Sequence, residues 1–458
     1  MLRKYGKLSR SDLQKQILTA SRIQPLLEEL PAELRIQILF NVDELDSIKS
    51  LVFASPKYHQ AYQITRHDIL IMHLQKSYDG LVDIQDAIAA IRSRGMYAIH
   101  PSNRERIIAL LDARRRCDEI RKLNLSYSQT LPDKPANVDE IIQLLRLHNV
   151  AMFFHDDFCK NAECPQWKEP LLWRSETLPL QLSRTEKRRF IRAFYRLQMY
   201  ANIFGNIEIS LEEKSPKREN RWNGYNLDRS NFTFTNVDFW RLVMSPMAPW
   251  EVEELGCFWQ YCFKRLAKSY NEIAESLLKG EARFQTRNIM EFPIHEQPPI
   301  QRYFYNVRDL SDHEISIRDG LVSMGPCFIK KVLREQDFIT RRNLVFANSV
   351  GNDHVFPEVW EFYLREYDEG PLPLVYPADK FSFGTDFAGL NEFLDSLPDH
   401  ERPNLLFRQR WLENTNILDF PGVFEDMFSY AGRKERWDWG YAFWDDERII
   451  RWGLSDLG

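Results

Sequence analysis

The sequence predicts a mainly α-helical protein, and three observations support this fold class. Apolar residues recur three and four positions apart through much of the chain, which is the spacing of one face of an amphipathic helix. Proline, serine and glycine stand at positions that begin or end such runs. No propeller, leucine-rich, kelch or tetratricopeptide repeat recurs along the sequence. We therefore expect helices joined by loops, without a repeat architecture.

Length and composition indicate a folded protein of several modules. The chain has 458 residues, of which 44% are apolar and 13% aromatic, so it can build packed cores and is not disordered throughout. Domains usually hold roughly 100–200 residues, which suggests two or three modules. The 61 basic and 66 acidic residues give a net charge of −5. Because nucleic-acid binders usually carry a basic surplus, we expect no nucleic-acid partner.

Cysteine usage and hydropathy favour an intracellular protein. The six cysteines are sparse and show no framework spacing, which is typical of a reducing compartment. No apolar run follows the basic N-terminus, so no secretory signal is expected. No window approaches ~18 consecutive apolar residues, so no membrane span is expected either. We expect the protein in the cytoplasm, the nucleus or both.

Three short helices are expected within residues 26–70, after a polar lead-in at residues 1–25. Pro31 stands where a first helical residue belongs, because its missing N–H costs nothing there. A short acidic break ends this helix, and Ser47 can cap the second one. The pair Ser55-Pro56 closes the second helix and can open the third.

Residues 71–458 are expected to form a large helical C-terminal region with long loops. Helical spacing or capping signals mark the segments 84–91, 107–120, 141–148, 183–200, 249–278, 317–336 and 357–367. The helix that follows Ser183 begins with a capping box completed by Glu186. Residues 211–231 and 370–384 are expected to be loops. Prolines between 293 and 299 suggest a sub-boundary near residues 280–300.

Aromatic side chains gather near the C-terminus, and we predict that they form core. They are Trp437, Trp439, Tyr441, Phe443, Trp444 and Trp452. Trp and Tyr are also enriched in binding hot spots, so a recognition surface is the alternative. A cluster of this kind more often pins the end of a chain onto its domain.

Residues 27–62 resemble an F-box of the kind common in filamentous fungi. The segment reads LEELPAELRIQILFNVDELDSIKSLVFASPKYHQAY, with an LP-x-E-L opening, an I-L pair, a short acidic break and a second leucine-bearing helix. At one position the chain has Tyr58 where the family usually has Trp, which keeps the ring but adds a hydroxyl that needs a partner. This resemblance covers under a tenth of the chain. Residues 245–254 and 440–445 also resemble the C-terminal regions of fungal F-box-like proteins of unassigned activity.

The resemblance implies a substrate receptor of a Skp–cullin–F-box E3 ubiquitin ligase, with no bond chemistry of its own. A module of ~40 residues is too small for a stable independent core, so it can leave apolar side chains for a partner to bury. The residues implied to face the Skp-type adaptor are Leu30, Pro31, Leu34, Ile38 and Leu39. Those implied to divide between adaptor contact and the module's own packing are Leu45, Ile48, Leu51 and Tyr58. The C-terminal region would bind an unknown protein target, and the adaptor would connect the chain to a cullin.

The remaining groups of His and Cys residues, and the search for catalytic motifs, predict no metal, cofactor or catalytic residue. His155, Cys159 and Cys164 lack the second ligand pair that a zinc site needs, so a loop with incidental thiols is expected. Cys257 and Cys262 are expected to be buried structural residues. No Walker-type loop, G-x-S-x-G, H-E-x-x-H or G-x-G-x-x-G motif occurs.

Charged runs are expected to be solvated. The adjacent acids at residues 156–157 and 445–446 are typical of exposed loops or helix starts. The basic runs at residues 114–116 and 187–189 fall on predicted helices and are expected to face solvent. A third basic run, at residues 214–218, lies in the charged loop and includes a possible phosphorylation or nuclear-localisation site.

Two rival functions stay open at this point. In the first, the F-box-like helices are part of a larger fold in a non-ligase interaction or scaffold protein. In the second, the C-terminal region holds an enzyme of unrecognised type, which would need a deep pocket with convergent titratable groups. Exposure of Leu30, Leu34 and Ile38 would favour docking over the first rival, whereas burial under residues beyond position 80 would count against it.

Overall fold

The computed structural model describes residues 26–42, 44–78, 84–123, 134–209, 234, 236–244, 246–284, 318–348, 387–399, 401–413 and 437–453. These residues form helices and connecting turns and include no strand, which confirms the mainly α fold class. None of the described helices combines the length and the apolar character that crossing a membrane requires. The lead-in, the helix predicted at 357–367, and the loops predicted at 211–231 and 370–384 lie outside the described residues.

The chain forms two compact units. Unit 1 comprises residues 1–79 and 136–145, and unit 2 comprises residues 80–135 and 146–458. The boundary that the sequence suggests at residue 70 falls inside a continuous helix, because nothing in that stretch breaks helical geometry. Unit 1 also takes in a later segment, since the Tyr78 hydroxyl donates a hydrogen bond to the Leu144 carbonyl at 2.9 Å.

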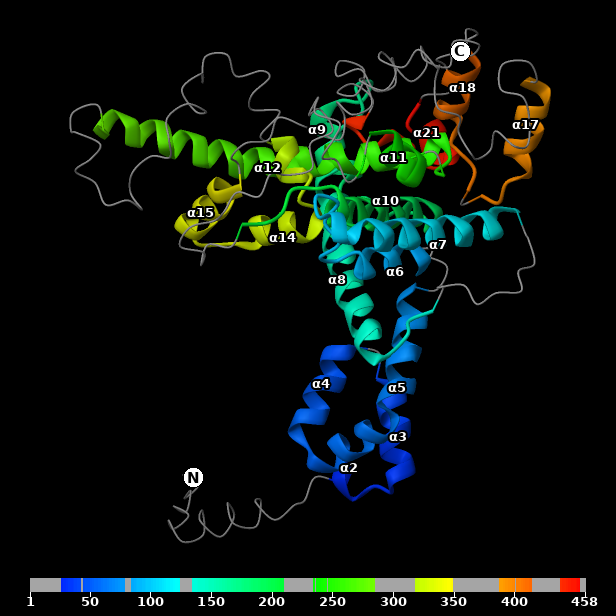
Figure 1. Ribbon diagram of the computed structural model, residues 1–458, viewed down its shortest axis with the longest axis vertical. Helices are drawn as coiled ribbons and strands as arrows, with labels where there is room; N and C mark the ends of the chain where they lie inside the picture. Colours follow the sequence, from blue (N-terminus) through cyan, green and yellow to red (C-terminus); the bar gives the residue numbers. More distant parts are fainter. Residues whose placement is uncertain are drawn as a thin grey trace, which may run out of the picture. The chain divides into compact units, whose positions relative to one another are not determined.

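Unit 1 is built around three helices, as expected for residues 26–70. Its elements in Figure 1 are α2 (Leu26–Glu29), α3 (Ala32–Asn41), α4 (Leu45–Ala54), α5 (Pro56–Tyr78) and the first turns of α8 (Val138–Asn161). Both α3 and α4 pack against α5. Pro31 precedes α3 in an extended conformation rather than being its first residue. The second helix begins at Leu45, two residues before the predicted cap, because its N-cap residue is Glu44.

Unit 2 holds the remaining helices. They are α6 (Ile84–Arg92), α7 (Arg104–Leu123), the rest of α8, α9 (Pro170–Leu172), α10 (Arg184–Ile203), α11 (Asn236–Phe239), α12 (Pro249–Phe284), α14 (Pro326–Arg334), α15 (Phe338–Asn348), α17 (Phe387–Ser396), α18 (Leu405–Glu413) and α21 (Asp446–Arg451). Short 3-10 turns at Pro101–Asn103 and Tyr441–Phe443, and π-helical turns at Trp173–Thr177 and Trp240–Met244, connect them. Helix α10 packs against α6, α12 and α14 and so occupies the centre of the unit (Figure 1).

The central helix α10 begins as the sequence predicts. The Ser183 hydroxyl accepts a hydrogen bond from the Glu186 N–H at 3.1 Å, and the Glu186 carboxylate accepts one from the Ser183 N–H at 2.9 Å. This reciprocal pair is a capping box, which satisfies N–H groups that a helix start leaves unpaired. Burial then extends along most of the helix, through its apolar residues and also through Arg189, Arg192 and Arg196.

The single helix predicted at residues 317–336 is wrong, because the chain turns within it. Gly325 has φ = 87°, a left-handed conformation that glycine adopts without steric cost. Pro326 then begins α14, where its missing N–H costs nothing. A Cβ on Gly325 would also lie 2.6 Å from the Ala201 Cβ of α10. The Gly-Pro pair therefore allows the chain to reverse directly against the central helix.

The aromatic cluster near the C-terminus is core, as predicted. Trp437 and Trp444 are buried. Trp444 stacks on Phe158 of α8, with ring centroids 5.6 Å apart. The indole N–H of Trp437 and the hydroxyl of Tyr441 both donate hydrogen bonds to the Glu253 carboxylate of α12, at 2.7 and 2.6 Å. These contacts hold the C-terminal segment onto α8 and α12.

Replacing Gly256 by alanine is expected to destabilise unit 2 by ~1–3 kcal/mol. Gly256 lies inside α12, and a Cβ there would be 2.3 Å from the indole of Trp437. Trp437 is buried and hydrogen-bonded, so it cannot move aside freely. Helix propensity alone would favour alanine by about 1 kcal/mol. Chemical denaturation followed by tryptophan fluorescence measures the change in the free energy of unfolding. A variant more stable than the native chain would contradict this packing.

Candidate functional site

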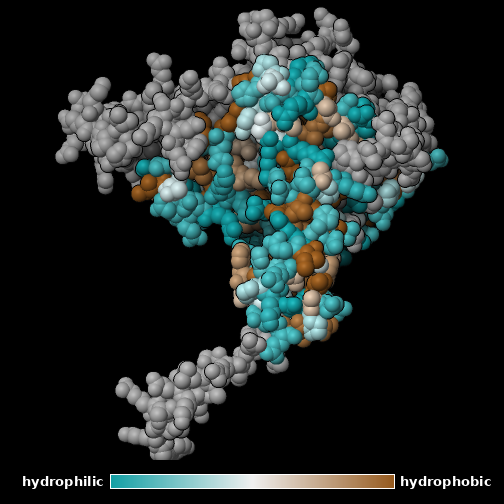
Figure 2. All heavy atoms as spheres, turned by 60° about the horizontal axis from the view of Figure 1, so that its bottom comes forward, coloured by the Kyte–Doolittle hydropathy of each residue, from teal (hydrophilic) through white to brown (hydrophobic). Residues whose placement is uncertain are grey.

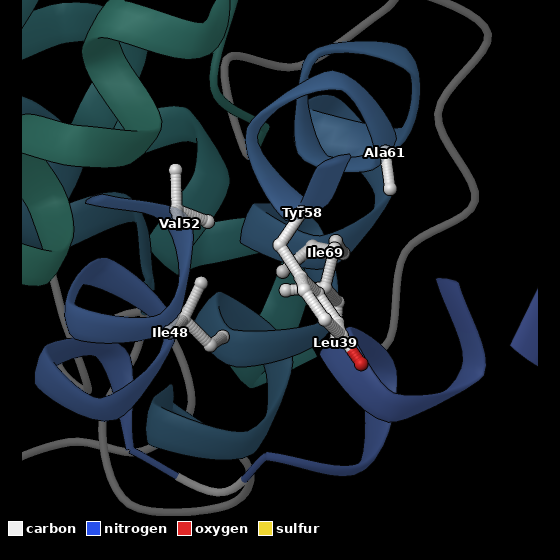
Figure 3. Packing of buried hydrophobic residues seen from close by; sticks show 6 residues of the cluster. All are labelled: Leu39, Ile48, Val52, Tyr58, Ala61 and Ile69. Atoms are coloured by element: carbon white, nitrogen blue, oxygen red, sulfur yellow. The ribbon is translucent and has the colours of Figure 1, made fainter. Parts of the chain in front are cut away.

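The candidate docking site is the surface of unit 1, which depends on a small apolar core. Its members, shown in Figure 3, are Leu39, Ile48, Val52, Tyr58, Ala61 and Ile69. Half-buried apolar side chains from α3, α4 and α5 pack around them. All of these residues lie between positions 36 and 69. This apolar core is therefore formed by residues of the segment that holds α3, α4 and α5 up to Ile69.

The structure divides the predicted adaptor-binding residues into exposed, half-buried and buried groups. Pro31 and Leu34 are exposed, with 43% of Leu34 accessible to solvent. The half-buried members are Leu30, Ile38, Leu45 and Leu51. The buried members are Leu39, Ile48 and Tyr58. The exposed members of the set thus lie at the start of α3.

Leu39 corrects the expectation that it faces the adaptor. It has no exposed surface and lies in the core with Tyr58 of α5 (Figure 3). Helical geometry explains this position, because Leu39 falls on the face of α3 that packs against α5. Ile48 and Tyr58 are likewise committed to the module's own packing. These three residues belong to the core of the module and not to its surface.

Exposed apolar side chains that sequence reasoning missed interrupt a largely hydrophilic surface (Figure 2). In unit 1 they are Leu27, Phe53 and Ile64, of which Phe53 is 77% and Ile64 80% exposed. A helical projection could have found Phe53. The core stripe of α4 contains Ile48 and Val52, and Phe53 lies about 100° beyond Val52 around the helix.

The Tyr58 hydroxyl, which the sequence marks as needing a partner, has none among the described residues. The backbone N–H of Tyr58 donates to the Ser55 hydroxyl at 3.4 Å, and this bond caps the start of α5. Burial raises the pKa of the Tyr58 hydroxyl, and the nearby Arg35 guanidinium acts against the rise. The hydroxyl therefore stays protonated and is a hydrogen-bond donor.

In unit 2, the structure separates the cysteines that the sequence raised as candidate ligands, and it places Cys159 on helix α8 and not in the expected loop. No group of three or more His, Cys, Asp or Glu side chains is placed to hold a metal ion within the part of the chain that the structure describes. Cys159 lies 3.8 Å from the His155 ring, whereas Cys164 contacts the carbonyls of Pro165 and Lys168. Burial raises the pKa of Cys159 to about 11, so its thiol is not an activated nucleophile.

A buried charge cluster in unit 2 is the main feature that sequence reasoning missed. Its members are Asp86, Arg114, Arg192, Arg196, Glu251, Glu254 and Glu401. Arg192 of α10 is fully buried and binds Glu254 of α12 through two hydrogen bonds of 2.9 and 2.6 Å. Burial alone would lower the pKa of Arg192, but Glu254, Glu251 and Glu401 raise it above its usual range.

The other arginines of the buried charge cluster extend it to α6. Arg196 lies 3.0 Å from Glu251 and 3.1 Å from Asp86 of α6, and Asp86 also pairs with Arg114 at 2.6 Å. Arginines one helical turn apart on α10 therefore connect α6 to α12. The sequence did carry a signal, since Arg192 and Arg196 stand four apart inside an apolar run.

The expectation of solvated charged runs is wrong at several positions. Arg114 is buried in the charge cluster, and Arg189 is buried beneath the C-terminal segment. Arg189 donates to the Asp445 carboxylate at 2.9 Å, and the Thr185 hydroxyl donates to the same group at 2.7 Å. The Ser183 hydroxyl also contacts Asp445. These charges are paired with one another across the fold, which compensates for the loss of solvent.

A small pocket lies in unit 2 among the described residues. It has a volume of about 60 Å³ and is lined by Phe158, Tyr261 and Trp437, with Lys264 and Asp438 among its charged residues. Lys264 and Asp438 pair with each other at 3.1 Å. Ligand pockets usually have volumes of roughly 300–1,000 Å³, so this pocket is small for a drug-sized ligand. No member of the buried charge cluster lines it.

No protein-family model, curated protein or solved structure matches this chain. The comparisons with known proteins therefore supply neither a family nor a function. What can be argued about function comes from the residues of unit 1, their exposure, and the pattern of residues 27–62.

Proposed function

We propose that the chain is a substrate receptor of a Skp–cullin–F-box E3 ubiquitin ligase. In this proposal unit 1 binds the Skp-type adaptor, and through it a cullin. Unit 2 binds a protein target. The chain supplies proximity between target and ligase, and the ubiquitin transfer belongs to the enzymes that the ligase recruits.

The observation that carries the proposal is the combination of a self-contained core with an exposed start of α3. The residues with the LP-x-E-L pattern lie at the start of α3, where Leu34 is 43% exposed and Pro31 is also exposed. Burying an apolar side chain of this size against a partner contributes roughly 1.5–3 kcal/mol. Several such contacts support a stable interface after the costs of association.

The scaffold alternative predicts a different arrangement of unit 1. It requires the F-box-like helices to be covered by later residues, so that Leu30, Leu34 and Ile38 are buried. Leu34 is exposed, and Leu30 and Ile38 are half-buried. The apolar core beneath them is built from residues 36–69. This arrangement favours docking over a purely structural role.

Replacing Leu34 by aspartate is expected to weaken adaptor binding at least about tenfold, because the contact loses apolar burial and gains a charge that must be desolvated. Leu34 is the cleanest position for this test, since Ile38 also packs against the core of unit 1. The measurement is co-purification of the Skp-type adaptor and cullin with the full chain.

The matched control for Leu34→Asp is Leu171→Asp. Leu171 is 74% exposed on α9 of unit 2, so the same chemical change is made in the other unit. Full co-purification is expected for Leu171→Asp. Equal recovery of the adaptor with both variants, or its absence from the native chain, would sink the assignment.

A further inference from the structure

Two cations of unit 2 lie over the same aromatic ring. The Lys330 ammonium is 5.2 Å and the Arg334 guanidinium carbon 5.7 Å from the centroid of the Phe153 ring. Both cations come from α14, and the ring comes from α8. Because Lys330 and Arg334 stand four residues apart, they lie on the same side of α14. These three residues form the cationic face of unit 2.

Neither cation of the cationic face has a carboxylate partner within the part of the chain that the structure describes. Helix α14 contains no acidic residue of its own. The neighbouring cations are paired, since Lys331 binds Glu208 at 2.6 Å and Arg341 of α15 binds Glu272 at 2.9 Å. The cationic face therefore carries positive charge that its surroundings in unit 2 do not balance.

Holding the two cations of the cationic face together is unfavourable in the free chain. Like charges four residues apart on a helix repel each other. Burial lowers the pKa of Lys330, and the charge of Arg334 lowers it further. The ring of Phe153 offsets part of this repulsion. The helix dipole also favours cations near the end of α14, but it acts on the paired Lys331 as well. An anion bound at the cationic face would relieve the repulsion.

We propose that the cationic face binds an acidic segment of a protein partner, whose carboxylates pair with Lys330 and Arg334. This inference rests on the proposed function in one respect, because the partner is then the target that unit 2 binds. Arg334 is exposed and Lys330 is half-buried on the outside of a helix, so the surface is open to a peptide segment. The net charge of −5 disfavours nucleic acid as the occupant.

The experiment measures the fluorescence anisotropy of a fluorescein-labelled hexaglutamate peptide as the full chain is added at low salt. The native chain is expected to bind the peptide, and added salt should weaken the binding. Lys330→Gln and Arg334→Gln are each expected to raise the Kd roughly fivefold, the size of one accessible ion pair. Lys331→Gln is the matched control, since it makes the same change at the adjacent position, where Glu208 already holds the cation. Its Kd should equal that of the native chain.

A second readout separates binding from folding. Chemical denaturation followed by tryptophan fluorescence reports on unit 2, because all twelve tryptophans lie there. Lys330→Gln should leave the free energy of unfolding unchanged or higher, since it removes the repulsion between the two cations. If Lys330 served only to hold α14 against Phe153, the same variant would lower the free energy of unfolding.

Four results would overturn the inference. They are no peptide binding by the native chain, equal Kd values for Lys330→Gln and Lys331→Gln, a raised Kd together with lost stability, and tighter binding of a labelled hexathymidine oligonucleotide than of the peptide. None of them affects adaptor binding, which is measured separately and is assigned to unit 1. Failure of adaptor binding alone would leave the cationic face as a site for an acidic segment and would remove only the role of that segment as a ligase target.

Discussion

Replacing Arg192 by methionine is expected to destabilise unit 2 by ~3–5 kcal/mol, the usual cost of removing one partner from a buried ion pair. Arg192 is fully buried and lies within 3.5 Å of carboxylates from Glu254, Glu251 and Glu401. Methionine fills most of the volume but removes the cation that these three acids share, while Glu251 keeps Arg196 at 3.0 Å. Burial already raises the pKa of Glu254, so without Arg192 this carboxyl is expected to take up a proton more readily.

The measurement for Arg192→Met is chemical denaturation followed by tryptophan fluorescence, which reports on unit 2 alone because every tryptophan lies there. Arg184→Met is the matched control, since Arg184 is exposed at the first residue of the same helix. Its effect should stay within about 0.5 kcal/mol. Similar losses for both variants would show that the buried charge cluster has no special role in holding α6, α10 and α12 together.

Acidification from pH 6.5 to pH 4 is expected to remove ~3 kcal/mol of stability through His148, at about 1.4 kcal/mol per pH unit. Burial lowers the pKa of His148 to about 4, and the charges of Lys187 and His155 act in the same direction. The unfolded chain has the ordinary pKa near 6.5, so it binds more protons than the folded chain between these values. The stability from neutral His148 is therefore complete above pH 6.5 and is lost as the pH falls.

The pH dependence of unfolding for His148→Gln isolates this contribution. Carboxylates also titrate at low pH. The quantity to compare is therefore the free energy of unfolding of the native chain minus that of the variant at each pH. Glutamine can still reach toward the Tyr195 hydroxyl, which lies 3.2 Å from the His148 ring. The pKa of His155 is lowered as well, and its contribution remains in both proteins. If the free energies of unfolding of the two proteins change in parallel between pH 4 and pH 6.5, His148 does not make the expected contribution.

Local signals in the sequence predicted local structure well. The capping box at Ser183 and Glu186 forms as expected, because both of its hydrogen bonds join residues three apart. The broken helix at Gly325 was missed for a related reason. Apolar spacing continues on both sides of the Gly-Pro pair, so periodicity favours one helix, whereas the left-handed conformation of Gly325 ends it.

The spacing of residues in the sequence could not predict which charged side chains pair across the fold. Arg192 and Arg196 looked like interruptions of an apolar face, and their carboxylate partners lie at positions as distant as Asp86 and Glu251. Which charges meet depends on how α6, α10 and α12 pack, and no single segment encodes that. The same limit applies to unit 1, where the pattern identified the helices but could not separate the buried Leu39 from the exposed Leu34.

The measurement that tests the central claim most directly is the binding of the full native chain to a purified Skp-type adaptor. Calorimetric titration at several temperatures is expected to show a one-to-one complex with a negative heat-capacity change, because docking buries apolar residues at the start of α3. The folded state of the chain should be verified in the same sample by circular dichroism. A folded chain that shows no binding to the adaptor would contradict the F-box assignment.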